Sequence, residues 1–269
     1  MRRLPAYAKI NLALVVGPLA PDGKHDVVTV LQRVGLADEI GLGAGAQLAV
    51  SGFEGDTIVT GALEALAAAA GVEPNWHVEI TKSVPVGAGL GGGSSDAACA
   101  LRLANELLPE PLEPDRLAEL AARIGADVPF FLTAGAQLGT GDGTILAPLD
   151  LPQDYSVVLV LPADTVKRST GDVYRVFDAR GGAADFDARR MELLETLADV
   201  RDARDLARLP PNDLASSPLS EQLRDAGAFR ADVSGAGPCV YGLFTESSEA
   251  AAAARALEAL GRTWVTAPV

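Results

Sequence analysis

A run of glycine and small residues lies in the first half of the chain and limits its possible fold more than any other feature. The run reads Pro85-Val86-Gly87-Ala88-Gly89-Leu90-Gly91-Gly92-Gly93-Ser94-Ser95-Asp96. The alternating segment before it, Trp76 to Ile80, predicts a strand, and apolar residues at helical spacing follow it as far as Leu108. Such a loop brings backbone N–H groups and a helix N-terminus close to a ligand, so this order favours phosphate binding. The alternative is a flexible linker whose Ser and Asp residues cap the helix.

Two common phosphate-binding loops are excluded at this segment. No lysine follows the glycines, so it is not a Walker A loop. The glycine spacing is also wrong for the dinucleotide-binding fingerprint, and no acidic residue ends a second strand at the required distance.

Three other segments carry groups that can do chemistry. Lys9 and Asn11 lie in an apolar strand, where an unpaired ammonium is costly; Lys9 therefore has a carboxylate or phosphate partner or, alternatively, extends its head into water. Asp127, in Gly125-Ala126-Asp127-Val128-Pro129-Phe130, can accept a proton from an alcohol, although the stretch alone favours a helix N-cap. Ser234-Gly235-Ala236-Gly237 is typical of a plain turn, and it can also form a second small-residue wall of a nucleotide site.

Composition narrows the class of protein. The 269 residues carry a formal net charge of -14, which argues against a nucleic-acid partner. Two cysteines, Cys99 and Cys239, are too few for a disulfide framework, and we expect both to be small buried residues. The N-terminus has no signal-peptide pattern and no stretch is long enough to span a membrane, so we expect a cytoplasmic protein.

The remaining pattern predicts an α+β chain. We expect strands over residues 8–16, 27–34, 48–50, 76–80, 155–161 and 263–266 and on both sides of 234–237, and helices over 57–70, 95–108, 114–124, 172–178, 188–197, 218–226 and 248–260. Strands and helices in mixed order favour α+β over a strict βαβ array. A change of character near residues 148–153 suggests a boundary between two domains.

These segments, in this order, resemble the GHMP kinase superfamily and, within it, the 4-diphosphocytidyl-2-C-methyl-D-erythritol kinases. Four motifs carry the resemblance: Ala8-Lys9-Ile10-Asn11-Leu12, Pro21-Asp22-Gly23-Lys24-His25, Gly89-Leu90-Gly91-Gly92-Gly93-Ser94-Ser95 and Gly125-Ala126-Asp127-Val128-Pro129-Phe130. The resemblance implies a two-domain fold with the active site in the cleft between domains. Residues 1–150 would form the ATP-binding domain and residues 151–269 a ferredoxin-like α+β domain.

The resemblance also implies the reaction and its residues. ATP with Mg²⁺ would phosphorylate the 2-hydroxyl of the cytidylyl substrate, with Asp127 as the base, Lys9 beside it, and the loop from Pro85 to Ser95 around the nucleotide. Asn11, His25, Lys24, Tyr174 and Gly235 would contact the substrate. Lys24 stands where the family usually has an aromatic residue that stacks on the cytosine ring, so it would lay its stem along the base or reach a phosphate.

Other functions fit parts of the pattern. A GHMP kinase for another alcohol (homoserine, a mevalonate-type compound or a sugar) has the same nucleotide loop. A non-catalytic nucleotide-binding module is a second possibility, which the presence of both Lys9 and Asp127 argues against. A purely structural role fits the sequence pattern least well, since the chain has no repeats or coiled-coil heptads. We expect a monomer or homodimer with no membrane partner.

Overall fold

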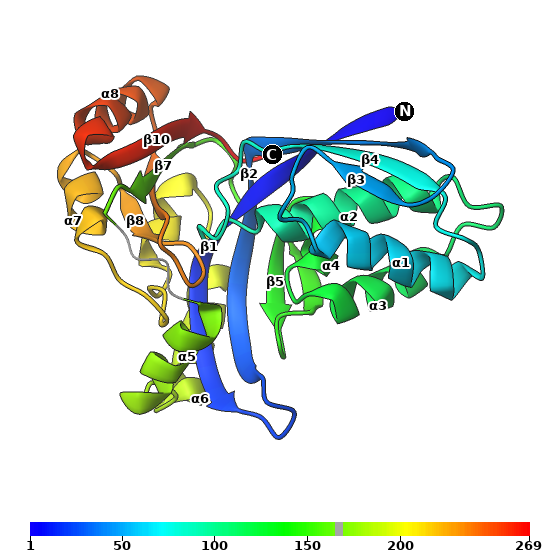
Figure 1. The fold of residues 1–269 in the computed structure, drawn as a ribbon. Helices are drawn as coiled ribbons and strands as arrows, with labels where there is room; N and C mark the ends of the chain where they lie inside the picture. The colour runs from blue at the N-terminus through cyan, green and yellow to red at the C-terminus, as the bar shows by residue number, and fades with distance from the viewer. Residues whose placement is uncertain (165–168) are drawn as a thin grey trace. The chain divides into compact units, whose positions relative to one another are not determined.

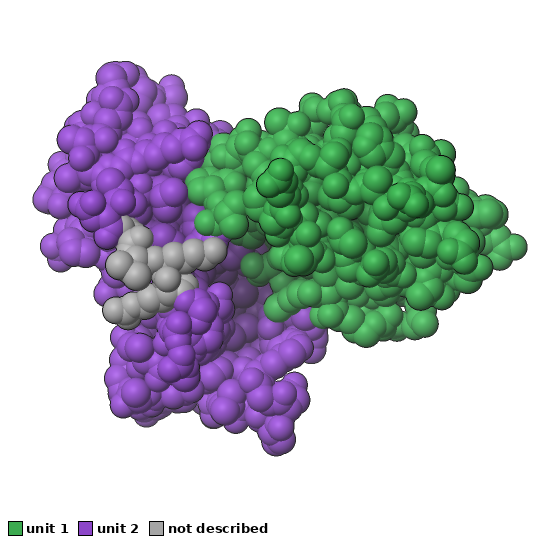
Figure 2. All heavy atoms as spheres, viewed as in Figure 1, with its two compact units in different colours: residues 1–8, 36–86, 91–134 green, residues 9–35, 87–90, 135–269 purple. Residues whose placement is uncertain are grey.

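The computed structural model describes residues 1–164 and 169–269 and divides into two compact units. Unit 1 contains Met1–Ala8, Leu36–Val86 and Gly91–Ala134, and unit 2 contains Lys9–Gly35, Gly87–Leu90 and Gly135–Val269 (Figure 2). The long strands β1 (Arg2–Leu19) and β2 (His25–Ala44) contribute residues to both units. Neither unit is a continuous segment, and the domain boundary near residue 150 stays a prediction.

Unit 1 is a layer of strands with helices on one side (Figure 1). Its strands are β3 (Ala49–Ser51), β4 (Trp76–Thr81) and the ends of β1 and β2, and its helices are α1 (Ile58–Ala70), α2 (Gly92–Asn105), α3 (Pro114–Ile124) and α4 (Val128–Leu132). Residues 39–44 of β2 pair antiparallel with β4, which pairs in parallel with β3. Helix α1 ends at Gly71 in the left-handed conformation, as the sequence predicted.

Unit 2 contains two groups of strands. Residues 29–31 of β2 pair with β5 (Ala136–Thr140), which pairs with β6 (Ile145–Leu149). A separate antiparallel sheet has the order β10 (Gly261–Thr266), β7 (Ser156–Pro162), β9 (Val240–Phe244), β8 (Arg230–Val233). The helical segments are α5 (Thr170–Ala179), α6 (Phe186–Ala198), η1 (Ala203–Arg208), α7 (Pro218–Asp225), α8 (Ser247–Leu257) and η2 (Glu258–Leu260).

Within the part of unit 2 that the structure describes, two hydrophobic clusters stabilise the fold. Helices α7 and α8 bury Leu223, Ala250 and Leu257 against the apolar face of the β7–β9 sheet. A second cluster joins α5 to β1 and β2 through Val173 and Phe177, with Ala236 packed against it. This second core attaches α5 to the strands that carry the predicted site residues.

The predicted elements are confirmed in kind and nearly in extent, and β1 and β2 are longer than expected. Among the described residues, the pattern missed β5, β6 and η1, and it indicated α4 only through the N-cap position of Asp127. Cys99 and Cys239 are buried and unbridged, as expected, and burial raises the pKa of the Cys239 thiol to about 12. Among the described residues, no helix is both long enough and apolar enough to cross a lipid bilayer.

Candidate functional site

Strand β1 holds Lys9 and Asn11 in a buried polar chain. Lys9 is only 3% exposed, and its Nζ donates to Oδ1 of Asn11 at 2.7 Å. Nδ2 of Asn11 donates to Oγ1 of Thr29 at 2.9 Å, and that hydroxyl donates to the Ala13 carbonyl. Because the Asn11 amide is fixed at both ends, the Lys9 ammonium is held in one place. The burial excludes the alternative in which its head lies in water.

The part of the glycine-rich segment that belongs to unit 2, Gly87–Leu90, contacts β1 and the turn after β8. The Lys9 N–H donates to the Leu90 carbonyl at 2.9 Å, and the Cys239 N–H donates to the Ala88 carbonyl at 3.0 Å. The Ser234 hydroxyl donates to the Gly89 carbonyl at 2.9 Å. Gly89 has φ +80°, and a Cβ there would lie 2.1 Å from the Ser234 carbonyl oxygen. Only glycine therefore permits this contact.

The turn formed by residues 234–237 lies against the Lys9 side chain. Gly235 has φ +55°, and a Cβ there would lie 3.3 Å from Nζ of Lys9 and 3.4 Å from Oδ1 of Asn11. The Gly237 N–H closes the turn on the Ser234 carbonyl. Unit 2 thus brings together the lysine strand, the Gly87–Leu90 loop and this turn, which the sequence singled out separately.

The rest of the glycine-rich segment belongs to unit 1, where it leads into α2. Gly91 is the N-cap in the left-handed conformation, with φ +70°, and the helix begins at Gly92. Since glycine has no side chain to cap the helix, the first-turn N–H groups are available to an anion, and the helix dipole favours one there. Ser94 lies half-buried in this turn, Ser95 is buried, and Pro85 and Val86 precede the loop.

A buried ionic cluster that the sequence analysis missed supports the same segment. Lys82 Nζ donates to Oδ2 of Asp96, in α2, at 2.7 Å and also to Asp38, which accepts from the N–H groups of Ser83 and Val84. Burial acts to lower the pKa of Lys82, but these carboxylates outweigh it and raise the pKa. Burial raises the pKa of Asp96 to about 7, against the opposing effect of Lys82. The cluster joins the strand before the loop to the helix after it.

Asp127 occupies the N-cap position of α4, with Pro129 in the first turn as the sequence indicated. Its backbone is already helical, with φ −82° and ψ −14°, and within the described residues its side chain makes no capping hydrogen bond. The cap interpretation is therefore right about position and wrong about the side chain. The carboxylate is half-buried and is not used to cap the helix.

His25 and Tyr174, expected at the substrate, lie together in unit 2. Their rings are 4.7 Å apart, and Phe177 approaches the imidazole edge-on at 6.0 Å. His25 Nε2 lies 2.9 Å from Oδ1 of Asp178, and the imidazole is 6% exposed. Lys24 lies differently: its ammonium pairs with Asp142 in the β5–β6 turn. The substrate role of Lys24 stays a prediction, since the partner that the described residues give its ammonium is Asp142.

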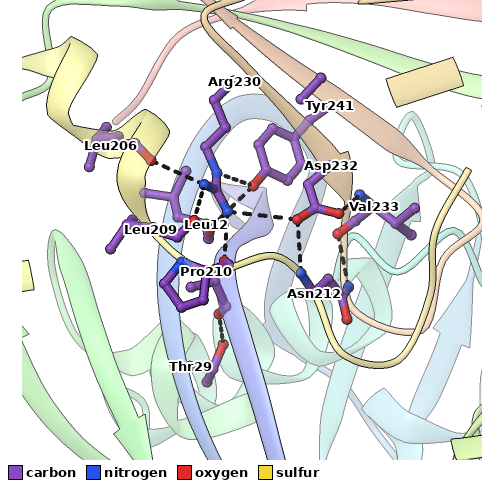
Figure 3. Close-up of polar contacts among 12 residues, drawn as sticks. Leu12, Thr29, Leu206, Leu209, Pro210, Asn212, Arg230, Asp232, Val233 and Tyr241 are labelled. Carbon is purple, nitrogen blue, oxygen red and sulfur yellow. Dashed lines mark hydrogen bonds and ion pairs between the residues drawn. The ribbon is translucent and has the colours of Figure 1, made fainter. Parts of the chain in front are cut away.

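A polar network around Arg230 was also missed (Figure 3). The guanidinium of this 6%-exposed residue donates to the carbonyls of Leu12, Leu206, Leu209 and Pro210 and to the Tyr241 hydroxyl. Asp232 lies 3.7 Å from it. The alternation of charged and apolar residues from Phe229 to Val233 indicates a strand that carries Arg230 and Asp232 on one face, but it gives no sign that this polar face is buried.

Two family profiles match the chain. The profile described as "GHMP kinases N terminal domain" matches residues 57–135, and the one described as "GHMP kinases C terminal" matches residues 185–263. Together they cover more than half of the chain, including α1 to α4 and all of β8, β9 and the turn between them.

Curated proteins and a solved structure give a narrower match. A protein of Desulfitobacterium hafniense (strain Y51) named "4-diphosphocytidyl-2-C-methyl-D-erythritol kinase" is 36% identical over 97% of this chain and 93% of its own length. A protein of the same name from Geobacter sulfurreducens is 37% identical over 99% of this chain and 97% of its own length. A crystal structure of 4-(cytidine 5'-diphospho)-2C-methyl-D-erythritol kinase superposes with a TM-score of 0.80 at 30% identity, covering 99% of both chains.

Proposed function

Since the chain belongs to the GHMP kinases and, within them, to the 4-diphosphocytidyl-2-C-methyl-D-erythritol kinases, we propose the function that follows from this membership. The chain is an ATP-dependent kinase with an alcohol as acceptor. It phosphorylates the 2-hydroxyl of 4-diphosphocytidyl-2-C-methyl-D-erythritol in the non-mevalonate synthesis of isoprenoid precursors. The cytoplasm, where ATP is available, is the compartment that we expect for it.

The observation that supports this function most strongly is the arrangement of small residues around Lys9. Gly89 and Gly235 each allow backbone to approach where a Cβ would collide or crowd, and Gly235 lies against the Lys9 ammonium. Phosphoryl transfer depends on positioning and charge neutralisation more than on covalent chemistry. A fixed ammonium beside a loop rich in backbone N–H groups supplies both.

We assign the chemical roles as follows. Asp127 accepts the proton of the substrate hydroxyl, the oxygen forms a bond to the γ-phosphorus of ATP, and the bond to the β-phosphate oxygen breaks to release ADP. Lys9 stabilises the negative charge that develops on the attacking oxygen. The N–H groups from Gly87 to Ser94 bind the phosphates, since that of Ser95 donates to the Gly91 carbonyl.

Magnesium fits this assignment. Its preferred ligands are oxygens, and it usually binds through substrate phosphates with few protein ligands. The hydroxyls of Ser94 and Ser95 lie in the first turn of α2 and are suitable ligands. When bound with ATP, Mg²⁺ neutralises phosphate charge.

His25 and Tyr174 are assigned to the cytidylyl group. Their adjacent rings give an aromatic surface of the kind on which a base stacks. Asn11, Gly235 and Lys24 are assigned to the same substrate. For Asn11 and Gly235, their position next to the Lys9 ammonium supports this assignment.

The test is a substrate panel with ADP release as the readout. The purified chain is given ATP and Mg²⁺ with 4-diphosphocytidyl-2-C-methyl-D-erythritol, homoserine or mevalonate, and a sample without acceptor gives the background hydrolysis. We expect turnover only with the first compound. If the chain phosphorylates another alcohol and does not phosphorylate 4-diphosphocytidyl-2-C-methyl-D-erythritol, the assigned substrate is wrong, while the assignment as an ATP-dependent kinase stands.

A further inference from the structure

Asn212 uses every hydrogen-bonding group of its side chain on neighbouring backbone. It is 7% exposed and follows η1 in unit 2. Nδ2 donates to the Gly235 carbonyl at 2.7 Å and to the Val233 carbonyl at 2.9 Å, while Oδ1 accepts from the Leu214 N–H at 2.8 Å. A buried amide satisfied on both sides has one orientation, because a flip would oppose donor to donor. The Gly235 carbonyl is therefore anchored to a point outside its own turn.

The backbone of Asn212 is itself fixed. Its N–H donates to Oδ2 of Asp232 at 2.8 Å, and residue 212 bridges to Leu14 of β1. Arg230 and Tyr241 both donate to the Leu12 carbonyl, one residue after Asn11 (Figure 3). The network thus fixes two things at once: the strand that carries Lys9 and the turn that lies against it.

Within this network, Asn212 is the residue that connects strand β1, which carries Lys9, to the 234–237 turn, through its hydrogen bond to the Gly235 carbonyl. Gly235 lies against the Lys9 ammonium and the Asn11 amide, as the positions of its hypothetical Cβ show. A turn released from Asn212 can move away from Lys9, which then gains freedom to leave the position that transfer requires. A displacement of about 1 Å at a catalytic group can lower a rate by as much as 100-fold.

We propose that Asn212 is a positioning residue of the kinase, which acts by holding the 234–237 turn against Lys9. Asn212 itself touches neither substrate nor nucleotide in this account. The inference rests on the proposed role of Lys9 in transfer. It extends the site beyond the motifs that identify the family.

The test is Asn212→Asp, which keeps the size of the side chain and its Oδ1 acceptor and removes both Nδ2–H donors. Asn105→Asp is the matched control. Asn105 likewise donates from Nδ2 to the Leu112 carbonyl and accepts from the Leu112 N–H, at the end of α2 away from the glycines. We expect Asn212→Asp to lower kcat at least tenfold, with KM for ATP within twofold of wild type. Asn105→Asp should keep the wild-type kcat.

Amide hydrogen exchange gives a second readout, because a general loss of stability would raise exchange throughout unit 2 and not in one segment. We expect faster exchange in the peptide covering residues 230–242 of Asn212→Asp, with no change across β10. Should Asn212→Asp fail to fold, Asn212→Ser, whose hydroxyl still donates one hydrogen bond, is measured in the same way.

Three outcomes overturn the inference. They are a folded Asn212 variant with wild-type kcat, an equal loss in Asn105→Asp, and exchange that rises uniformly across unit 2. Lys9→Met, measured in parallel, separates this inference from the role of Lys9. A Lys9→Met enzyme at the wild-type rate refutes the role of Lys9, whereas loss in Lys9→Met with no loss in Asn212→Asp refutes the inference about Asn212 alone.

Discussion

The Nε2 atom of His25 lies 2.9 Å from Oδ1 of Asp178, and this contact ties the imidazole from the start of β2 to helix α5. Tyr174 stacks on the same imidazole from one turn earlier in the helix. The Asp178 carboxylate is 44% exposed, and an exposed ion pair contributes little to the stability of the fold. The main effect of this contact is therefore to orient the imidazole ring.

We therefore predict that Asp178→Ala raises KM for the cytidylyl substrate several-fold and leaves kcat within about twofold. The ring would lose its fixed orientation, while the transferring groups stay unchanged. Steady-state kinetics at saturating ATP measure both constants. Asp172→Ala is the control, because it removes another ion pair of α5, with Arg175. An unchanged KM in Asp178→Ala would show that the contact does not orient His25 for the substrate.

Replacing either proposed catalytic group should abolish transfer and spare nucleotide binding. Asp127→Asn keeps the shape of the side chain and removes the base, and Lys9→Met keeps the length and removes the charge. General-base catalysis contributes roughly 100- to 10,000-fold, and one group that stabilises the developing charge contributes roughly 100- to 1,000-fold. We therefore expect kcat to fall at least about 100-fold in each variant. Calorimetric titration with an ATP analogue checks that binding remains. A near-normal kcat in one variant removes that residue from its role.

We predict that Gly235→Ala lowers kcat mainly because the new methyl group displaces the Lys9 ammonium, and only to a lesser extent because of backbone strain. The added methyl group lies 3.3 Å from Nζ of Lys9, so we expect kcat to fall about tenfold or more as the ammonium is displaced. Left-handed backbone at a non-glycine residue also costs roughly 1–2 kcal/mol of stability.

Gly71→Ala is the matched control for that strain. Gly71 has φ +67°, and nothing lies within 4 Å of a Cβ there. We expect a similar loss of stability on urea denaturation and an unchanged kcat. Equal kinetic losses in the two variants would show that strain, and not contact with Lys9, causes the effect.

The stability of the fold should depend on the protonation of Asp96. Burial raises its pKa in the folded protein to about 7, above the roughly 3.9 of an unfolded chain. Between these values the folded state binds more protons than the unfolded state, so this group lowers stability as pH rises from about 4 to 7. Asp96→Asn removes that dependence and leaves the contact of Lys82 with Asp38.

Urea denaturation of both proteins from pH 5 to pH 8 checks this prediction. The free energy of unfolding of Asp96→Asn, minus that of the wild type, should increase with pH through this window and then level off. A difference that is constant with pH would show that Asp96 does not titrate near neutrality in the folded protein.

The sequence predicted those parts of the site that depend on residue type in a local pattern. The glycine-rich segment, the strand with Lys9 and the turn at residues 234–237 each have a local signal, and the structure brings them together. Elements β5 and β6 were missed because Gly139 and Pro148 interrupt their pattern. In the structure, pairing with β2 and with each other stabilises these two strands.

The supporting network could not be predicted in the same way. Arg230 and Asn212 bond mainly to backbone carbonyls, which every residue has, so no partner side chain marks the contact in the sequence. Their roles follow only when segments distant along the chain are placed side by side. The same holds for Asp178, whose exposed helical position has no local sign of its contact with His25.

The most direct test of the account is phosphorus NMR of the reaction itself. The purified chain is incubated with ATP, Mg²⁺ and 4-diphosphocytidyl-2-C-methyl-D-erythritol, with Asp127→Asn in a parallel sample. We expect a new phosphomonoester resonance, equal in amount to the ADP formed, in the wild-type sample alone. ADP without a phosphomonoester, or an equal resonance from the Asp127→Asn sample, would contradict the account.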